Sequence, residues 1–388
     1  MSILRGFIHR PQRVWLRRVN FQIHLWAGLI LTLYLIVIGI TGAILVFREE
    51  IENPWHNLQA TAPPADPVTV ITSVRAAFPQ SRLLTLTAPT KSNPVYTAIL
   101  QGRGRRLGES RIALNPMTGQ ILGPVPRRST WLNTIRNLHE TLLIGVTGRQ
   151  INAILAGILL LINLTGVVVW WPGIKTWTRA LTVDFARGWR RINFDLHRAA
   201  GFWTLAIVTM WAISGVYFGY SGEARTYINR ISPLVSAEPP RVRVEPQRGT
   251  ADLRTILTQA ASLDPGTTLR SIAFPSGRRA PLEIAMQRPD TTGAEFADTL
   301  YFDPYDGTCL AIWKYGINQS LGDWFIWLQI PLHFGTYWGL TVKIIWATSS
   351  LILVLLCVTG ALMYWNRYLR RHLPFAGPGT RIDRRVVV

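Results

Sequence analysis

The segment Leu25–Phe47, LWAGLILTLYLIVIGITGAILVF, decides the fold class of this chain. It contains no Asp, Glu, Lys or Arg, and it is long enough to cross a bilayer, because a spanning helix needs only about 20 apolar residues. Three further segments share this character: Ile151–Trp171, Ala199–Tyr220 and Ile344–Trp365. The sequence therefore predicts a membrane protein built on a bundle of four transmembrane helices.

The composition agrees with this class once the charged residues and the apolar residues are considered separately. The 388 residues carry 41 Lys+Arg against 21 Asp+Glu, a net charge of +20, yet 48% of them are hydrophobic. Such a charge is typical of nucleic-acid-binding proteins, but four spans of this length exclude that class, and we expect no nucleic-acid partner. With only Cys309 and Cys357, a disulfide framework is excluded too.

The orientation follows from basic residues beside the spans. They precede the first span, separate the second from the third, and follow the fourth: Arg5, Arg10, Arg13, Arg17, Arg18, Lys175, Arg179, Arg187, Arg190, Arg191, Arg367, Arg370 and Arg371. By the positive-inside rule these segments are cytoplasmic. We expect a cytoplasmic N-terminus (1–24), a cytoplasmic loop (172–198) and a cytoplasmic tail (366–388), with spans at 25–47 and 199–220. The opposite side holds two domains, 48–135 and 221–325, each followed by an outer helix and a span, 136–171 and 326–365.

Four histidines mark an internal repeat. His24 precedes Thr41-Gly42 by the same interval as His197 precedes Ser214-Gly215. A second, longer interval separates His139 from Thr165-Gly166, and it recurs unchanged between His333 and Thr359-Gly360. The two halves are therefore predicted to be copies of one unit, related by a pseudo-twofold axis along the membrane normal.

The outer segments repeat as well. Asn115–Gly119 (NPMTG) and Asp303–Gly307 (DPYDG) both indicate a hairpin turn, with Pro at the first central position and Gly closing it. A helical and a β-rich stretch precede each turn, at 67–78 and 83–100 in the first copy and at 251–262 and 269–285 in the second. The sequence thus predicts two small α+β domains.

The predicted topology sorts the histidines into pairs. His24 and His197 lie at the cytoplasmic end of the bundle, and His139 and His333 lie at the outer end. Two imidazoles that face one another between apolar helices can bind a haem iron from both sides. A single histidine at a membrane edge is more often an interfacial anchor, and zinc would need further ligands. Small residues that would leave room for a porphyrin face are Gly28, Gly39, Gly42, Gly201 and Gly215, although close helix packing explains each of them as well.

Two outer arginines complete the candidate site. Arg136 and Arg149 lie near His139 in the sequence, and we expect them to contact haem propionates. His56 follows the first span without a counterpart in the second half, and it is a candidate neighbour of the outer haem.

The chain resembles the PepSY-associated transmembrane family over nearly its whole length. The residues that carry this resemblance are His24-x3-Gly28, Thr41-Gly42, Leu138-His139-Glu140, Thr165-Gly166, Trp170-Trp171-Pro172, Asp195-Leu196-His197-Arg198 and Pro331-Leu332-His333. The resemblance implies PepSY-like outer domains, two haem b groups held by the four histidines, and a bacterial inner-membrane reductase that releases iron from a ferric siderophore of the ferrioxamine type during iron uptake. No dinucleotide or flavin motif is present, so the electron donor is expected to be a separate cytoplasmic reductase or membrane quinol.

Two other functions remain open from the sequence. The spans could anchor a pair of PepSY domains that bind or restrain another protein without redox activity. The chain could also be an iron-chelate permease, although the spans lack the intramembrane charges and broken helices that transporters use.

Overall fold

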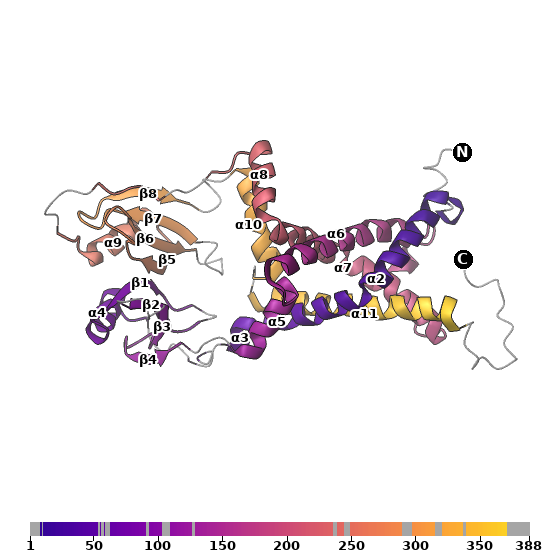
Figure 1. The fold of residues 1–388 in the computed structure, drawn as a ribbon, viewed down its shortest axis with the longest axis horizontal. Coiled ribbons are helices and arrows are strands. Elements are labelled where there is room, and N and C mark those ends of the chain that lie inside the picture. Colours follow the sequence, from indigo (N-terminus) through magenta and orange to yellow (C-terminus); the bar gives the residue numbers. More distant parts are fainter. Residues whose placement is uncertain are drawn as a thin grey trace.

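The chain folds into a helical bundle and a mixed helix–sheet region joined at one end of the bundle (Figure 1). This computed structural model describes residues 8–9, 11–52, 55, 58, 63–90, 93–102, 109–125, 129–235, 239–243, 249–288, 297–314, 320–336 and 339–370. The described parts near the two termini lie at the bundle end that is farthest from the sheet (Figure 1).

Four helices are long and apolar enough to cross a membrane: α2 (Trp15–Val46), α6 (Gly145–Trp170), α7 (Trp189–Gly219) and α11 (Gly339–Tyr364). α11 continues into a π-helical turn, Trp365–Leu369. The predicted spans end within one residue of these helices, but every helix begins at least a full turn before its predicted span. His24 and His197 therefore lie inside the helices α2 and α7, immediately before the predicted spans.

The four long helices form a closed ring. α2 packs against α6 and α11, and α7 packs against the same two helices. α2 and α7 therefore face one another diagonally across the bundle. The bundle interior contains apolar residues from all four helices: Leu31, Leu35, Leu159, Ile162, Val208, Ala212, Leu353 and Cys357.

Short helices surround the bundle. They are the 3-10 turns η1 (Pro11–Arg13) and η2 (Thr178–Leu181), and the α-helices α3 (Arg48–Glu52), α5 (Thr130–Thr141), α8 (Ser221–Ile231) and α10 (Leu321–Phe334). α10 has well-defined ends, because Ser320 and Asp323 form a capping box and Gly335 ends the helix at φ 67°. α5 and α10 precede α6 and α11 and carry the two outer histidines.

The outer region repeats one order of elements. The first half has α4 (Pro67–Ala77), β1 (Ser81–Thr87), β2 (Tyr96–Gly102), β3 (Glu109–Leu114) and β4 (Ile121–Pro124). The second has α9 (Leu253–Leu263), β5 (Thr268–Ala273), β6 (Leu282–Gln287), β7 (Ala297–Phe302) and β8 (Cys309–Trp313). Asp66 and Asp252 cap the helices at equivalent positions.

Both predicted turns are confirmed. The amide of Gly119 donates to the carbonyl of Asn115 at 3.0 Å, and that of Gly307 donates to Asp303 at 2.9 Å. The two glycines have φ of 68° and 79°, a left-handed conformation that glycine adopts without a steric penalty. The turns join β3 to β4 and β7 to β8.

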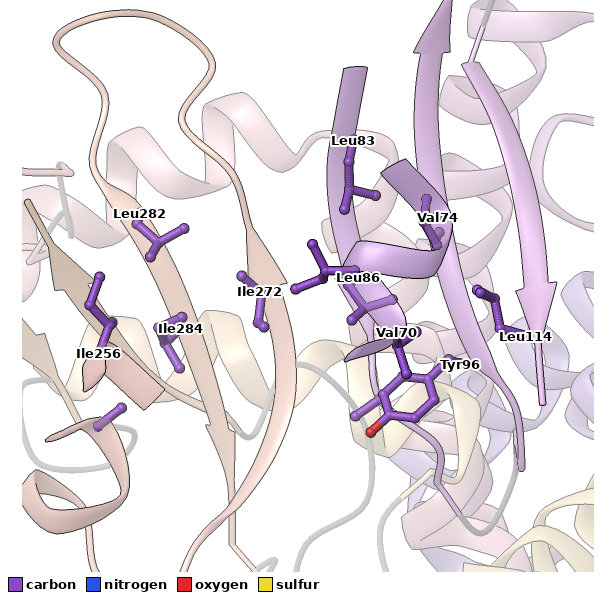
Figure 2. Close-up of a cluster of buried hydrophobic side chains, with 14 of the residues drawn as sticks. Val70, Val74, Leu83, Leu86, Tyr96, Leu114, Ile256, Ile272, Leu282 and Ile284 are labelled. Carbon is purple, nitrogen blue, oxygen red and sulfur yellow. The ribbon is translucent and has the colours of Figure 1, made fainter. Parts of the chain in front are cut away.

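The prediction of two separate outer domains requires correction. The strand order is β4-β3-β2-β1-β5-β6-β7-β8, a single antiparallel sheet of eight strands in which β1 pairs with β5. Leu86 and Ile272 are direct partners across that junction, and their side chains lie together in the apolar cluster of Figure 2. This cluster also includes Val70 on α4 and Ile256 on α9, so the two halves share one core. Each such side chain contributes about 1.5–3 kcal/mol by leaving water.

Candidate functional site

The structure brings the four repeated histidines together in the two predicted pairs. The ring centres of His24 on α2 and His197 on α7 are 6.3 Å apart, with the ring planes at 87°. Those of His139 on α5 and His333 on α10 are 6.4 Å apart, at 70°. Each pair faces across the bundle, and the two pairs lie at different depths along it.

The hydroxyl of a Thr-Gly or Ser-Gly motif contacts each ring. The motif always lies on a long helix of the same half of the chain, but never on the helix that carries the histidine. The Nδ1–oxygen distances are 3.4 Å for His24 and Thr165, 2.9 Å for His139 and Thr41, 2.9 Å for His197 and Thr359, and 2.6 Å for His333 and Ser214. His24 and His197 also bond the backbone carbonyls of Ile162 and Leu356, at 3.0 and 3.1 Å.

The carbonyls of Ile162 and Leu356 can only accept, so Nδ1 of His24 and of His197 carries the hydrogen. The hydroxyl contacts are compatible with the same tautomer at the other two rings. Every one of the four hydroxyls donates its single proton to carbonyls one turn earlier in its own helix, as Thr41 does to Val37 at 2.7 Å and Ser214 does to Met210 at 2.9 Å. With its proton given to a carbonyl, the hydroxyl oxygen can accept from a ring Nδ1–H, which is the same tautomer at all four rings. The lone pair is left on Nε2, which is the arrangement of a metal-ligating histidine whose other nitrogen is hydrogen-bonded.

The glycine of the motif lets the ring approach its helix. A Cβ atom built on Gly166 would lie 3.2 Å from Cε1 of His24, and one on Gly42 would lie 3.2 Å from Cε1 of His139. At Gly360 the corresponding distance to His197 is 3.3 Å. Gly215 departs from this pattern, because its closest neighbour is Ala156. The two motif residues therefore have separate tasks, one bonding the ring and one making space for it.

The prediction that five glycines leave room for a porphyrin face agrees with the structure only in part. Gly39 is tight against Ser350 and Val354 of α11, Gly42 is tight against His139, and Gly215 is tight against α6, so these three support close packing. Gly28, one turn after His24, has nothing within 4 Å of an added Cβ. Gly201 holds the equivalent position after His197, where Leu356 is at 3.7 Å. Space beside the rings is thus found at the inner pair.

The ring separations fit a shared metal ion. Two imidazoles on opposite sides of one ion, with bonds of about 2 Å and ring nitrogens about 1 Å from the ring centres, have centres about 6 Å apart. Within the described residues no three His, Cys, Asp or Glu side chains converge on one point. Each pair therefore offers two nitrogen ligands, the number that an iron already held by a porphyrin requires.

The outer pair is apolar in its surroundings. The edge of Phe218 packs on the His333 ring at a centroid distance of 5.1 Å. Burial lowers the pKa of His139 to about 4, and burial together with the neighbouring His139 lowers the pKa of His333 to about 3. Both rings are consequently neutral near pH 7, as a metal ligand must be.

Comparison with known proteins identifies the family of the chain. The family described as the PepSY-associated TM region matches residues 21–367, which is most of the chain. The chain belongs to the PepSY-associated TM family. A similar protein is the uncharacterized protein PA4219 of Pseudomonas aeruginosa, 26% identical over 260 residues, which are 61% of this chain and 64% of that protein. The match therefore spans less than two thirds of the relative's length.

The predicted arginines of this PepSY-associated protein differ in placement. Arg136 lies on α5 one turn before His139, on the same helix face, and its buried Nε has no hydrogen-bond partner among the described residues. Arg149 is exposed near the start of α6. The structure thus favours Arg136 over Arg149 as a group beside the outer pair, and His56 lies outside the described residues.

Sequence reasoning missed what the hydroxyls do in this PepSY-associated chain. The two repeated intervals located Thr41, Thr165, Ser214 and Thr359, but they relate each motif to the histidine before it in the sequence. In the fold the partners are exchanged: the Thr41 hydroxyl bonds His139, and the Thr165 hydroxyl bonds His24. The exchange is explained by the antiparallel course of α2 and α6, which brings the end of one beside the start of the other.

Proposed function

We propose that this protein is a transmembrane dihaem electron carrier that reduces a ferric siderophore on the outer side of the bacterial inner membrane. The observation that carries the proposal is the pair of histidine pairs. Each has the separation of two ligands on one ion, each ring is fixed through Nδ1, and each leaves Nε2 for iron. Two bis-histidine sites without an open iron position suit electron transfer better than oxygen chemistry.

The residues present fit haem b. His24 and His197 would hold the inner group, and His139 and His333 the outer one. Gly28 keeps open space beside the inner pair, and the unpartnered Nε of Arg136 offers a donor for a propionate at the outer pair. When bound, haem supplies one-electron redox chemistry at each pair.

The fold separates the two histidine pairs along the bundle and surrounds the space between them with apolar side chains. Thr41 marks the depth of the outer pair and lies on the same continuous helix as His24. Since a helix rises about 1.5 Å per residue, the stretch from position 24 to position 41 separates the two pairs by about 25 Å along the bundle. Apolar residues from all four helices fill the bundle interior, and such surroundings exclude water and lower the local dielectric constant.

The proposal also names the substrate and the direction of electron transfer across the membrane. Basic flanks favour cytoplasmic termini, and on that orientation the outer pair and the eight-stranded sheet would face the periplasm. An electron would come from a cytoplasmic flavin reductase or from membrane quinol. One electron converts one Fe(III) chelate of the ferrioxamine type to its Fe(II) form, which oxygen-donor chelators hold more weakly.

An ancient duplication is part of the same proposal. The order of one long helix, two short helices, four strands, an outer helix and a second long helix occurs twice. Equivalent histidines and hydroxyls occupy equivalent places in both copies. A duplicated unit explains why both ligand pairs form across one pseudo-twofold axis, since each copy contributes one ligand to each pair.

The test is a stopped-flow reoxidation of the dithionite-reduced protein in detergent by ferrioxamine B, ferric citrate and a catecholate chelate. We expect rapid reoxidation by at least one chelate, with stoichiometric Fe(II) captured by a ferrous-specific dye. The His333→Ala variant should retain the inner haem and reoxidise far more slowly. A haem-loaded protein that none of these chelates reoxidises faster than a buffer control would rule out the reductase proposal and favour another acceptor.

A further inference from the structure

The outer histidine helix α5 ends in a tight corner, with Leu142 and Leu143 at positive φ, directly before α6, and α10 ends at its cap Gly335, a few residues before α11 begins at Gly339. Carbonyls in the last turn of a helix lack an amide partner within that helix. At the end of α5, Nδ2 of Asn152 on α6 donates to the carbonyl of His139 at 2.7 Å and to that of Glu140 at 3.5 Å. Asn152 therefore bonds the backbone of the very residue whose ring faces the site.

Asn152 is itself held from α2. The hydroxyl of Tyr34 donates to Oδ1 of Asn152 in a short hydrogen bond. Tyr34 lies two helical turns before Thr41, so both side chains are on the same face of α2. His139 is thus held at two points, its ring by Thr41 and its carbonyl by Asn152, and α2 supports both holds.

In the second half of the chain, a tryptophan takes the place of Asn152. Trp346 follows His333 in the sequence by the same interval as Asn152 follows His139. Its Nε1 donates to the carbonyl of Leu332 at 2.5 Å, one residue before the ligand. Gly335 makes this contact possible, because a Cβ atom there would lie 2.8 Å from the indole.

Trp346 is contacted by α7, the helix whose Ser214 hydroxyl bonds the His333 ring. Trp211 on α7 packs edge-on against Trp346, with centroids 6.5 Å apart and planes at 81°. Trp211 lies about one turn before Ser214, whose hydroxyl bonds His333. Asn152 and Trp346 therefore occupy the same place in the repeat, and each contacts the helix whose hydroxyl bonds the ring, at Tyr34 two turns before Thr41 and at Trp211 one turn before Ser214.

From these contacts we infer that Asn152 and Trp346 are positioning residues for the outer pair, setting the depth and aim of His139 and His333. This inference rests on the proposed function, since its consequence is bis-histidine ligation of the outer haem. The inner rings have no such corner, because His24 and His197 lie within continuous helices. Loss of either positioning residue should therefore affect the outer centre alone.

The test replaces Asn152 by Leu, a side chain of similar volume without hydrogen-bonding groups. The readouts are haem content and the low-spin bis-histidine signals in electron paramagnetic resonance, with the His139→Ala variant used to assign the outer signal. We expect Asn152→Leu to lose or broaden the outer low-spin signal while the inner signal stays at the wild-type level. The Tyr34→Phe variant, which keeps the bond to His139, should show a smaller change.

The matched control is Asn163→Leu. Asn163 lies on the same helix and bonds Thr209 of α7 at 3.2 Å, with no hydrogen bond to a histidine segment in the described chain. It should leave both signals unchanged. If Asn152→Leu does not fold, Trp346→Phe keeps an aromatic ring and removes the donor, and it tests the same idea. Two unchanged signals in a folded Asn152→Leu or Trp346→Phe protein would overturn the positioning role, whereas a haem-free wild type would overturn the proposed function instead.

Discussion

The hydroxyl of Thr41 on α2 lies 2.9 Å from Nδ1 of His139 on α5, joining residues 98 positions apart. The reciprocal contact runs from His24 on α2 to Ile162 and Thr165 on α6. The two halves of the chain repeat this exchange, with Ser214 at His333 and Thr359 at His197. Every candidate ligand is therefore oriented by a helix other than its own, so the packing of the bundle directly determines the geometry of both pairs.

Replacing Thr41 by Val should weaken the outer centre. Nδ1–H of His139 would lose its hydroxyl acceptor and keep only the backbone carbonyl of Ile38, at a cost of about 0.5–1.5 kcal/mol, and loss of such a partner lowers metal affinity about 10–100-fold. Haem content after dialysis against apomyoglobin measures this. Thr41→Ser should behave as wild type, and Thr32→Val is the matched control, because Thr32 bonds only its own helix at Gly28. Equal haem retention in Thr41→Val and Thr32→Val would contradict the role given to the hydroxyl.

Replacing Gly28 by Leu tests whether the space beside His24 is used. Nothing lies within 4 Å of a Cβ atom there, and leucine favours a helix over glycine by about 0.8 kcal/mol. The thermal midpoint of the haem-free protein should stay the same or rise, while the content of the inner haem falls. Gly222→Leu, also in open space but on α8, should leave haem content unchanged. A Gly28→Leu protein with its full haem complement would show that the group lies elsewhere.

The ion pair between Lys343 and Glu50 joins a buried cation to an exposed carboxylate, so its two single replacements should differ in their effect on stability. Nζ of Lys343 on α11 lies 2.7 Å from Glu50 and 3.9 Å from Glu49, and the lysine is the more buried partner. Glu50→Gln should cost about 2 kcal/mol because a buried cation loses its closest partner, whereas Lys343→Met should cost less than about 1 kcal/mol because Glu50 can be hydrated. Thermal unfolding in detergent measures both. The reverse order would mean that Glu50 is the desolvated group.

The Asp66–Arg254 contact predicts an acid-sensitive link between the halves of the outer region. Their charged groups are 2.7 Å apart, and Asp66 also caps α4. Burial alone raises the pKa of Asp66, but hydrogen bonds from Thr69 and the charge of Arg254 outweigh it, so the pKa lies below its ordinary value. A lowered folded pKa gives stability that is present above about pH 4 and is lost as the pH falls through the folded value.

The Asp66→Asn variant isolates the charge in that contact. Asparagine keeps the helix cap, so the variant should lose about 0.5 kcal/mol at pH 7, the usual contribution of an exposed pair. The difference from wild type should shrink as the pH falls from 5 to 3, and urea unfolding at each pH measures it. A difference that stays constant or grows over that range would exclude the ion pair as its cause. Asp66→Ala should cost about 1 kcal/mol more because the cap is lost as well.

Much of the fold could be read from the sequence where one physical cause dominates. Hydropathy located the ends of the long helices to within a residue, and Pro and Gly located the turns at Asn115 and Asp303. All four long helices begin before the predicted spans, because hydropathy reports only the membrane-embedded part of a helix. Arg17 and Asn20 are compatible with a helix but not with an apolar window.

The remaining features depend on contacts that no local pattern encodes. Alternation in β1 shows which side chains face the core, but it does not reveal that β5 is the neighbouring strand. The histidine pairing was predictable because the matched intervals and the topology together determine depth. The partners of the rings, and the contacts of Asn152 and Trp346, required the packing of α6 and α11 against the outer helices.

The central claim is that the four histidines hold two haem b groups, and it is tested most directly by a pyridine haemochrome measurement on the purified full-length protein with matched amino-acid analysis. Two haems b per chain is the expected result, falling to one in His24→Ala and to one in His139→Ala, each with the other pair intact. A folded wild-type protein that contains no haem when expressed with ample haem supply would contradict the account, and loss of both haems in either single variant would contradict the pairing by depth.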